Sequence, residues 1–345
     1  MQLKNINKGY SEFLYEIETL IFQKKNNLSE EYDKYFKEDE NNKSIYDKGF
    51  KKHLMPIRNK KHIKSIIQKT IKLKQKLSPY NDDLEISLLD FGCGNGIIYT
   101  ECLKDLCKKY KNVKFKITAF DISKEGLKSY INKLKKDNFK IDGEIIIGKD
   151  TKIYDIGLLH KDNCSIKLVH GFITDNLPAL KNILGQFDIS LAIYGVLNHI
   201  PCEINRKKVF EFLCEISNHK VLIHVSTLGS YKKEQICFEV LRKNKIPFQM
   251  AVEENDIYYS RITDNSTIVN YYHLVDIKEL NKLKNLKINK KFKMLLGCYY
   301  PHRQISSGLI MNILDRIMCI LLSLFPLKIS QHLVKYLFLE INTEK

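Results

Sequence analysis

The fold of this 345-residue chain is decided by residues 88–98, which read Leu-Leu-Asp-Phe-Gly-Cys-Gly-Asn-Gly-Ile-Ile. A short apolar strand, predicted over residues 86–89, enters a loop with a glycine at every second position. A helix-competent segment follows from Ile97 to about Lys109. Glycine lets the backbone turn sharply and approach a ligand closely, and a helix N-terminus offers unpaired N–H groups. The pattern predicts a ligand-binding loop at the carboxyl end of a parallel strand.

The order of acid and glycines favours S-adenosylmethionine over a dinucleotide. Residues 90–96 read Asp-x-Gly-x-Gly-x-Gly, whereas dinucleotide-binding loops read Gly-x-Gly-x-x-Gly. A carboxylate at Asp90 would repel a pyrophosphate, but it can accept hydrogen bonds from the ammonium group of an amino-acid ligand. The alternative is a tight strand–helix turn without a ligand. The expected cofactor contacts in this loop are Asp90, Gly92, Cys93, Gly94, Asn95 and Gly96.

This loop resembles the first motif of class I S-adenosylmethionine-dependent methyltransferases, and the resemblance covers roughly residues 85–300. It implies an α/β, Rossmann-like fold with a mostly parallel seven-stranded sheet, helices on both faces and an antiparallel edge. The remaining sequence agrees, because strands alternate with helices in the order that a doubly wound sheet requires. These further strands are predicted over residues 116–123, 166–171, 187–194 and 220–226.

The resemblance extends the cofactor site to the ends of three more strands. In the family, an acid after the second strand binds the ribose hydroxyls; here it is Asp121, followed by Ile122. Asp121 could also cap the helix that follows it. After the third strand the family often carries Gly-Asp, whereas this chain has Gly171 and Phe172. Phe172 could pack on the purine, or Asp175 could reach in from the loop, and Ile173 is also expected in the cofactor site. Tyr194 and Gly195, after the fourth strand, complete the expected set.

The acceptor side of the site is predicted after the fourth strand. Residues 196–200 read Val-Leu-Asn-His-Ile and resemble the Val-Leu-x-His-Ile segment of many small-molecule and RNA-directed members. His199 is a candidate general base for an oxygen acceptor, or a histidine that only bonds a neighbouring loop. His273 is a second candidate, or part of a packed aromatic cluster. An Asn/Asp-Pro-Pro-aromatic tetrad is absent, which argues against methylation of planar nitrogens.

Composition constrains the partners only weakly. The formal charge is +17, and of 57 basic residues only six are Arg, so 51 are Lys. Abundant Lys, Ile and Asn indicate an AT-rich coding bias, so the charge permits RNA or acidic lipids without requiring them. Nine cysteines without a C-x-x-C pair indicate reduced core residues and no metal site. The N-terminus lacks the apolar stretch of a signal peptide, so we expect a cytoplasmic protein.

The chain divides into three expected parts. Residues 1–80 form a Lys-rich helical extension, with helices near residues 11–21 and over residues 62–76. Residues 81–300 form the methyltransferase core, with an insertion at 139–163 that contains a further apolar run at 144–147. Beyond the fifth strand the pattern predicts antiparallel strands over 256–261 and 267–273, a helix over 277–283 and a last strand near 292–299.

Residues 301–345 form an apolar tail that is predicted to be helical. Between residues 312 and 323 the polar side chains fall on one narrow stripe. Asp315 and Arg316 argue against a helix that spans a membrane, and Pro326 ends the run. A second apolar helix is predicted over residues 329–341. The tail could pack on the core or on a second copy in a homodimer, or lie in a membrane interface through residues 308–341.

The leading hypothesis is a methyltransferase that acts on a small-molecule or lipid-linked acceptor, most simply at oxygen. A tRNA-modifying enzyme is the alternative, because residues 271–274 ahead of Glu279 look like a segment of wobble-uridine carboxymethyl methyltransferases. A catalytically inactive, cofactor-binding scaffold subunit is the third hypothesis. The unusual Phe172 and the apolar tail motivate it.

Overall fold

A nine-stranded sheet forms the centre of the molecule. The computed structural model describes residue 33 and residues 57–77, 84–142, 154–171, 177–227, 248–253, 255–263, 266–286, 292–298, 309–334 and 336–343. The sheet order is β11-β12-β7-β6-β1-β2-β5-β4-β3. Its members are β1 (Leu84–Phe91), β2 (Val113–Asp121), β3 (Lys140–Asp142), β4 (Tyr154–Lys161), β5 (Cys164–His170), β6 (Phe187–Ala192), β7 (Ser217–Ser226), β11 (Phe292–Cys298) and β12 (Tyr336–Asn342).

The five central strands run parallel. In the sheet, β2 and β5 lie on one side of β1, and β6 and β7, which come later in the chain, lie on its other side. On one side β1 pairs with β2, which pairs with β5, and on the other side β1 pairs with β6, which pairs with β7. Leu88 lies opposite Ile117 on β2 and opposite Ile189 on β6. In open parallel sheets a ligand binds at such a switch point, beyond the carboxyl ends of the strands. The glycine loop therefore begins at the position where the topology favours a ligand.

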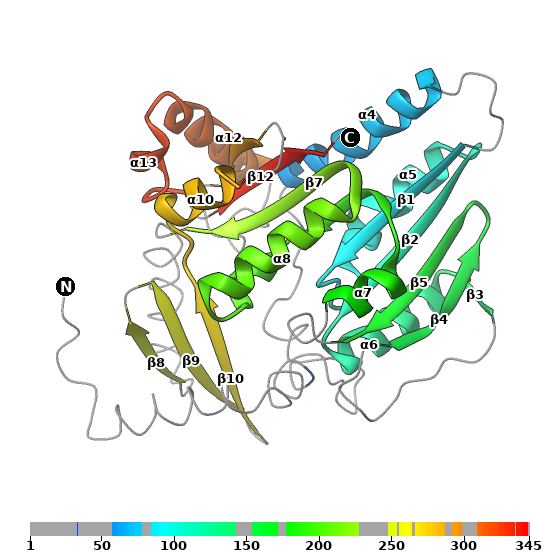
Figure 1. Cartoon of the computed structure of the whole chain (residues 1–345), viewed down its shortest axis with the longest axis horizontal. Helices are drawn as coiled ribbons and strands as arrows, with labels where there is room; N and C mark the ends of the chain where they lie inside the picture. Colours follow the sequence, from blue (N-terminus) through cyan, green and yellow to red (C-terminus); the bar gives the residue numbers. More distant parts are fainter. Residues whose placement is uncertain are drawn as a thin grey trace.

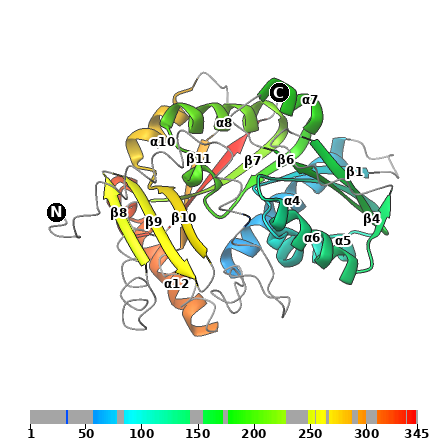
Figure 2. The same ribbon diagram turned by 90° about the horizontal axis from the view of Figure 1, so that it is seen from below.

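Helices cover both faces of the sheet, as the alternating pattern predicts (Figure 2). One face carries α4 (Ile57–Leu77), α5 (Lys104–Lys109) and α6 (Lys124–Lys136), and the other carries α7 (Leu177–Leu184), α8 (Glu203–Glu215) and α10 (Ile277–Lys284). Leu88 of β1 belongs to the first apolar cluster, and its neighbour Leu89 belongs to the second. The alternation of strand side chains thus feeds two cores, and the predicted α/β fold is confirmed.

The strand count differs from the predicted seven because the insertion contributes to the sheet. β3 and β4 come from residues within 139–163 and extend the edge beyond β5 in antiparallel pairing. The apolar run at 144–147 lies outside the described residues. The antiparallel edge on the opposite side is also present, because β12 pairs antiparallel with both β7 and β11.

The predicted helix over residues 329–341 is wrong. Of the described residues in this range, those of α13 (Leu327–Ser330) are helical, and residues 336–342 form β12, inserted between β7 and β11. Leu337 and Leu339 pack in one apolar cluster and Phe338 packs in the other. A strand that is buried on both faces reads as a continuous apolar run, which periodicity alone cannot distinguish from a buried helix.

A second, three-stranded antiparallel sheet stands apart from the main one (Figure 1). It consists of β8 (Phe248–Glu253), β9 (Asp256–Thr263) and β10 (Ser266–His273), in the order β10-β9-β8. The predicted pair over 256–261 and 267–273 is confirmed as β9 and β10. It does not extend the main sheet: β10 packs beside the 3-10 helix η3 (Val196–His199), which follows β6.

The tail helix α12 (Leu309–Ser323) is present and packs beside β11 and α4. Among the described residues, no helix is both long enough and apolar enough to cross a bilayer.

Because β12 lies inside the sheet, its side chains contribute to the core. We expect Leu339→Ala, at a side chain that is 0% exposed, to reduce the free energy of unfolding by about 3 kcal/mol. Ile329→Ala, at a side chain that is 51% exposed, is the control and should change it by less than about 0.5 kcal/mol. Denaturant titration followed by circular dichroism measures both. Equal, small effects would show that β12 is dispensable.

Candidate cofactor and acceptor site

The glycine loop is held against the neighbouring strand by its own backbone. Gly92 N and Cys93 N both donate to the carbonyl oxygen of Phe120 on β2, at 2.8 and 3.1 Å. Gly92, Gly94 and Gly96 have φ values of +71°, +51° and +77°, in the left-handed region that favours glycine. The loop is therefore a continuation of the β1–β2 pairing and has little freedom of its own.

Two of these glycines are also required by packing. A Cβ at Gly96 would lie 2.2 Å from the ring of Tyr130 on α6, and one at Gly92 would lie 2.5 Å from Val196. Both distances are below any real contact. Val196 belongs to the segment after β6, so the glycine loop directly contacts the predicted acceptor segment. The sequence spacing thus brings both halves of the predicted site together.

Asp121 joins the second strand to the glycine loop. Its Oδ2 accepts a hydrogen bond from Gly94 N at 2.6 Å, and its Oδ1 accepts one from Ser123 N at 2.8 Å. The cap of α6 is Ser123, whose Oγ accepts from Gly126 N at 2.9 Å, so Asp121 is not that cap. A carboxylate has about four acceptor sites. Asp121 can therefore hold the loop and still accept a hydrogen bond from a ribose hydroxyl.

Asp90 is a buried acid with an unsatisfied oxygen. The residue is 2% exposed, and its Oδ2 has no hydrogen-bond partner among the described residues. Burial, together with the nearby charge of Asp121, raises the pKa of Asp90 to about 8, and burial raises the pKa of Asp121 to about 6. Two neighbouring buried acids with raised pKa values favour a cationic ligand, because a positive charge relieves both penalties. These residues fit the ammonium and sulfonium groups of S-adenosylmethionine.

The other residues of the loop have backbone roles. Cys93 and Asn95 are buried, and burial raises the pKa of the Cys93 thiol well above its usual value. The carbonyl oxygen of Asn95 accepts a hydrogen bond from Lys133 Nζ at 3.1 Å. The carbonyl oxygen of Ile122 accepts one from His170 Nε2 at 2.9 Å. Phe172 and Ile173 lie outside the described residues.

Asp33 is a site residue that the sequence did not single out. Its Oδ1 accepts hydrogen bonds from Ser123 Oγ at 2.7 Å and from Glu125 N at 2.9 Å, at the start of α6. Its partner Ser123 is two residues beyond Asp121, so Asp33 lies beside the expected ribose position. It sits in a charged stretch with no motif around it. The sequence around it therefore gave no signal that could have found it.

Tyr194 and Gly195 form a sharp turn at the end of β6, beside the glycine loop. Both have positive φ, +65° and +74°. Tyr194 N donates to His224 Nδ1 at 3.0 Å, which fixes the turn to β7. A Cβ at Gly195 would lie 2.9 Å from Asn198 Oδ1, so glycine is required here as well. The turn directs the chain into η3 at the same end of the sheet as the glycine loop.

Asn198 fixes η3 between two sheets. Its Nδ2 donates to the carbonyl oxygens of Ser226 at 3.0 Å and His273 at 2.5 Å, and its Oδ1 accepts from Ser226 N at 2.9 Å. The side chain is fully buried. The sequence places Asn198 beside the predicted acceptor position, but its role in joining two sheets depends on contacts with Ser226 and His273 that are distant in the sequence.

His199 is half-buried, and a backbone group of β10 orients its ring. Its Nδ1 lies 3.0 Å from the carbonyl oxygen of Tyr271. A carbonyl only accepts, so Nδ1 carries the hydrogen and Nε2 carries the lone pair of the neutral ring. Burial lowers the pKa of His199 to about 4, which keeps the ring neutral near pH 7. The ring of Tyr272 packs edge-on against it at 4.9 Å.

His273 lies between two carboxylates in a buried network. Its Nδ1 is 2.6 Å from Asp256 Oδ1, and its Nε2 is 2.8 Å from Glu279 Oε2. Burial opposes the charged ring, but these two hydrogen bonds outweigh it, and the pKa of His273 is raised. With an acceptor at each nitrogen, both positions carry a proton. A ring in this state donates two hydrogen bonds and has no lone pair to offer.

Arg206 extends this network to α8. Its Nε donates to Glu279 Oε1 at 2.7 Å, and one of its terminal nitrogens donates to the carbonyl oxygen of Ile200 at 3.0 Å. Burial works against the charge of Glu279, but its bonds to His273 and Arg206 lower its pKa to about 2. The network therefore joins α8, α10 and β10 to the end of the acceptor segment.

The structure brings the sequence-predicted residues together in two layers. Asp90, the glycine loop, Asp121, Tyr194 and Gly195 lie at the carboxyl ends of β1, β2 and β6, and His199 follows on η3. His273 lies behind His199, on the strand whose backbone orients it. Across the part of the chain that the structure describes, no cluster of three His, Cys, Asp or Glu residues could hold a metal ion.

No known family profile matches this sequence, and no curated protein matches it. Solved structures with a similar arrangement include an S-adenosylmethionine-dependent methyltransferase from Clostridium acetobutylicum, with 13% identity over 86% of this chain and 96% of that chain, and a TM-score of 0.44. A sugar N-methyltransferase from Streptoalloteichus is 10% identical over 73% and 87%, with a TM-score of 0.41. An amino pentose methyltransferase from Micromonospora echinaspora, solved with S-adenosylmethionine bound, is 9% identical over 87% and 97%, with a TM-score of 0.38. A likeness at this level does not define a family.

The glycine loop offers a matched pair of substitutions. Gly96 and Gly185 have nearly equal φ values, +77° and +80°, but a Cβ at Gly185 meets nothing within 4 Å. We expect Gly185→Ala to cost about 1 kcal/mol of backbone strain and to leave S-adenosylmethionine affinity unchanged. Gly96→Ala should weaken that affinity at least about tenfold, because the loop must move away from Tyr130. Calorimetric titration of both folded variants measures the two affinities. Equal affinities would contradict the assignment of the glycine loop to the cofactor site.

Proposed function

We propose that this protein is an S-adenosylmethionine-dependent methyltransferase that transfers a methyl group to a hydroxyl oxygen of a small-molecule acceptor. The observation that carries the proposal is Asp90, a buried acid with an unsatisfied oxygen beside Asp121. The acid lies directly before a glycine loop at the switch point of a parallel sheet. Such a pair is costly without a ligand and favourable with a cationic one.

The proposed cofactor supplies a methyl group that is activated for displacement by its bond to a positively charged sulfur. Asp90 would hold the ammonium group, the backbone of residues 92–96 would face the amino-acid portion, and Asp121 would bind the ribose. Asp33, which bonds Ser123 at the start of α6, would lie near the ribose end. With the cofactor held in this way, the reaction would depend mainly on bringing an acceptor oxygen into line with the methyl carbon.

His199 is the residue best suited to orient that acceptor. Its neutral ring presents Nε2 as an acceptor for the hydrogen of a substrate hydroxyl, while Tyr271 fixes the other nitrogen. With the cofactor bound, the acceptor oxygen would take the methyl group from the sulfur, and Nε2 of His199 would accept the hydroxyl proton and release it to solvent. Because the pKa of His199 is only about 4, the ring aligns the hydroxyl more than it deprotonates it beforehand.

The contacts of His273 favour a positioning role for this residue. It was the second candidate base, but its two nitrogens both donate to carboxylates. Tyr271, whose carbonyl orients His199, is two residues away on the same strand, and its hydroxyl donates to Asp256 at 2.8 Å. His273 and its partners therefore hold the strand that holds His199.

Cofactor binding should depend on pH through Asp90 and Asp121. Both acids must be ionised to attract a cation, and their pKa values are about 8 and about 6. Affinity for S-adenosylmethionine should thus rise as the pH increases from 6 to 8, by about tenfold or more. Asp90→Asn should weaken binding at pH 8 and flatten this dependence.

The control for this experiment is Asp105→Asn, an exposed carboxylate on α5, which should behave as the wild type. Calorimetry at several pH values measures the affinity, and thermal unfolding checks that each variant is folded. Affinity that is independent of pH, or unchanged in Asp90→Asn, contradicts the assignment of Asp90.

Substitution of His199 should mainly affect the reaction rate, whereas substitution of His273 should mainly affect the stability of the protein. His199→Gln should reduce kcat about a hundredfold with cofactor affinity and melting temperature nearly unchanged. His273→Gln should reduce the free energy of unfolding by about 3 kcal/mol, because it leaves buried charges without a partner. The assay follows labelled methyl transfer from S-adenosylmethionine into small-molecule fractions of a cell extract. A wild-type protein that binds the cofactor but labels no fraction would instead support the inactive scaffold.

A further inference from the structure

The tail helices expose a continuous apolar surface. Ten large apolar side chains of residues 310–333 are between 40% and 78% exposed, and together they are called the apolar face here. They are Ile310, Ile313, Leu314, Ile317, Ile320, Leu321, Leu324, Phe325, Ile329 and Leu333. Proteins that work alone in water rarely leave so many large apolar groups together at the surface.

The spacing shows that this surface is one side of a regular helix. Positions 310, 313, 317, 320 and 324 follow each other at intervals of three and four residues, which places them along one stripe. The opposite side of α12 carries Asp315, Cys319 and Leu322, which are buried against the protein. Both sides of α12 are therefore apolar, and only one of them contributes to the core.

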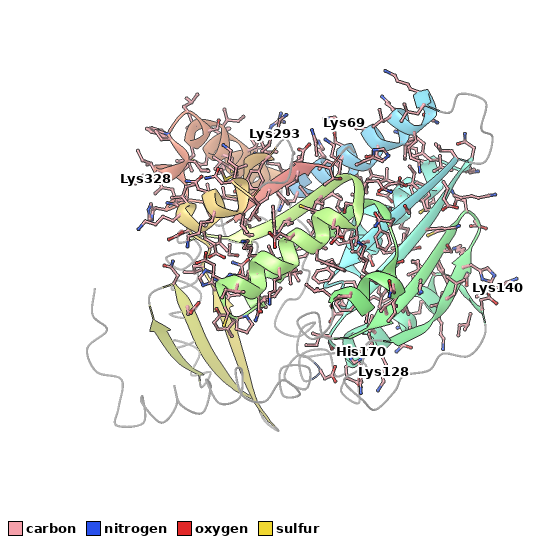
Figure 3. The ribbon with its side chains drawn as sticks, in the orientation of Figure 1. Lys69, Lys128, Lys140, His170, Lys293 and Lys328 are labelled. Atoms are coloured by element: carbon pink, nitrogen blue, oxygen red, sulfur yellow. The ribbon has the colours of Figure 1, made fainter. Side chains whose placement is uncertain are left out.

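Basic side chains outnumber acidic ones on the described elements beside the apolar face, although three lysines of α4 are paired with acids of neighbouring elements: Lys60 with Glu101, Lys64 with Asp105 and Lys74 with Asp188. Lys69 of α4, Lys293 of β11 and Lys328 of α13 lie along the edge of the molecule that carries α12 (Figure 3), and α10 and β12 lie on the same side (Figure 1). Among residues 57–77, 292–298 and 309–334, Asp315 is the single acid, and it is 2% exposed. The basic residues in these ranges are Arg58, Lys60, Lys61, Lys64, Lys69, Lys72, Lys74, Lys76, Lys293, Arg316 and Lys328.

This charge pattern argues against a second copy of the chain as the occupant. In a twofold-symmetric dimer the same patch faces itself, so basic side chains would meet basic side chains. An anionic bilayer surface complements the patch in both respects, since it accepts apolar groups between its headgroups and attracts the surrounding lysines. With 15 residues, α12 is too short to span the hydrocarbon core, so it would lie in the interface.

We propose that the apolar face docks this protein onto membranes that contain anionic lipids. Leu324 and Phe325, at the turn between α12 and α13, are 78% and 54% exposed and would insert between the headgroups. Arg316 and Lys328 would contact the anionic headgroups beside them. Docking does not depend on the proposed methyl transfer, and it is measured without cofactor. If both hold, the acceptor is delivered at a membrane surface.

The test is flotation of the full-length protein with vesicles of phosphatidylcholine, with and without phosphatidylglycerol. The wild type should float with the anionic vesicles, and added salt should weaken the association. The double variant Leu324→Glu, Phe325→Glu should reduce the bound fraction by about tenfold or more. The matched control is Ile204→Glu on α8, where an apolar side chain outside the apolar face is 68% exposed; it should float like the wild type.

Three outcomes would overturn the proposal. The first is a wild type that stays with neither kind of vesicle, and the second is equal binding by the double variant. The third is a wild-type dimer in light scattering that the double variant converts to a monomer, without vesicle binding by either protein. That result would assign the apolar face to a second copy of the chain. Melting temperatures of all variants confirm that each is folded.

Discussion

The rest of the structure depends on the join between the glycine loop and the second strand. Phe120 accepts two backbone hydrogen bonds from the loop, and Asp121 accepts a third, from Gly94. The same residues that would hold a cofactor therefore also fix the first two parallel strands to each other. Asp90 lowers the stability of this arrangement, because a buried acid with an unsatisfied oxygen costs free energy until a cation binds it. The glycine loop and the β1–β2 pairing are consequently one arrangement, and a cation bound at Asp90 would offset the cost of burying that acid.

A buried charged network holds the segment after β6 in place. Arg206, Glu279 and His273 form a charged network in the interior, and such networks add little net stability compared with apolar packing. What the network contributes is a unique placement. It connects α8, α10 and β10 to the end of the acceptor segment, while Asn198 connects that segment to β7. Tyr271, His273 and Glu279, which made the chain look like a tRNA-modifying enzyme in sequence, are all occupied by these structural contacts.

The sequence predicted the features that depend on local chemistry. The glycine loop, the five parallel strands and the β9–β10 pair follow from turn residues and apolar periodicity, and the structure has them. Three features could not be predicted because they depend on distant contacts. Asp33 acquires its contacts only through residues about 90 positions away in the sequence, at the start of α6. β12 reads like a helix until both of its faces are known to be covered, and β3 and β4 gain strand pairing only from the edge of β5.

The apolar face belongs to the long connection between the neighbouring strands β11 and β12. Neighbouring antiparallel strands can be joined by a turn of two residues, yet this chain leaves the sheet at Cys298 and returns at Tyr336. The intervening residues include α12 and α13, whose inner side packs on the protein and whose outer side stays apolar and exposed. The sheet does not need this excursion to close its edge. Because both of its ends are fixed in the central sheet, a surface that binds the apolar face would also fix the orientation of the sheet.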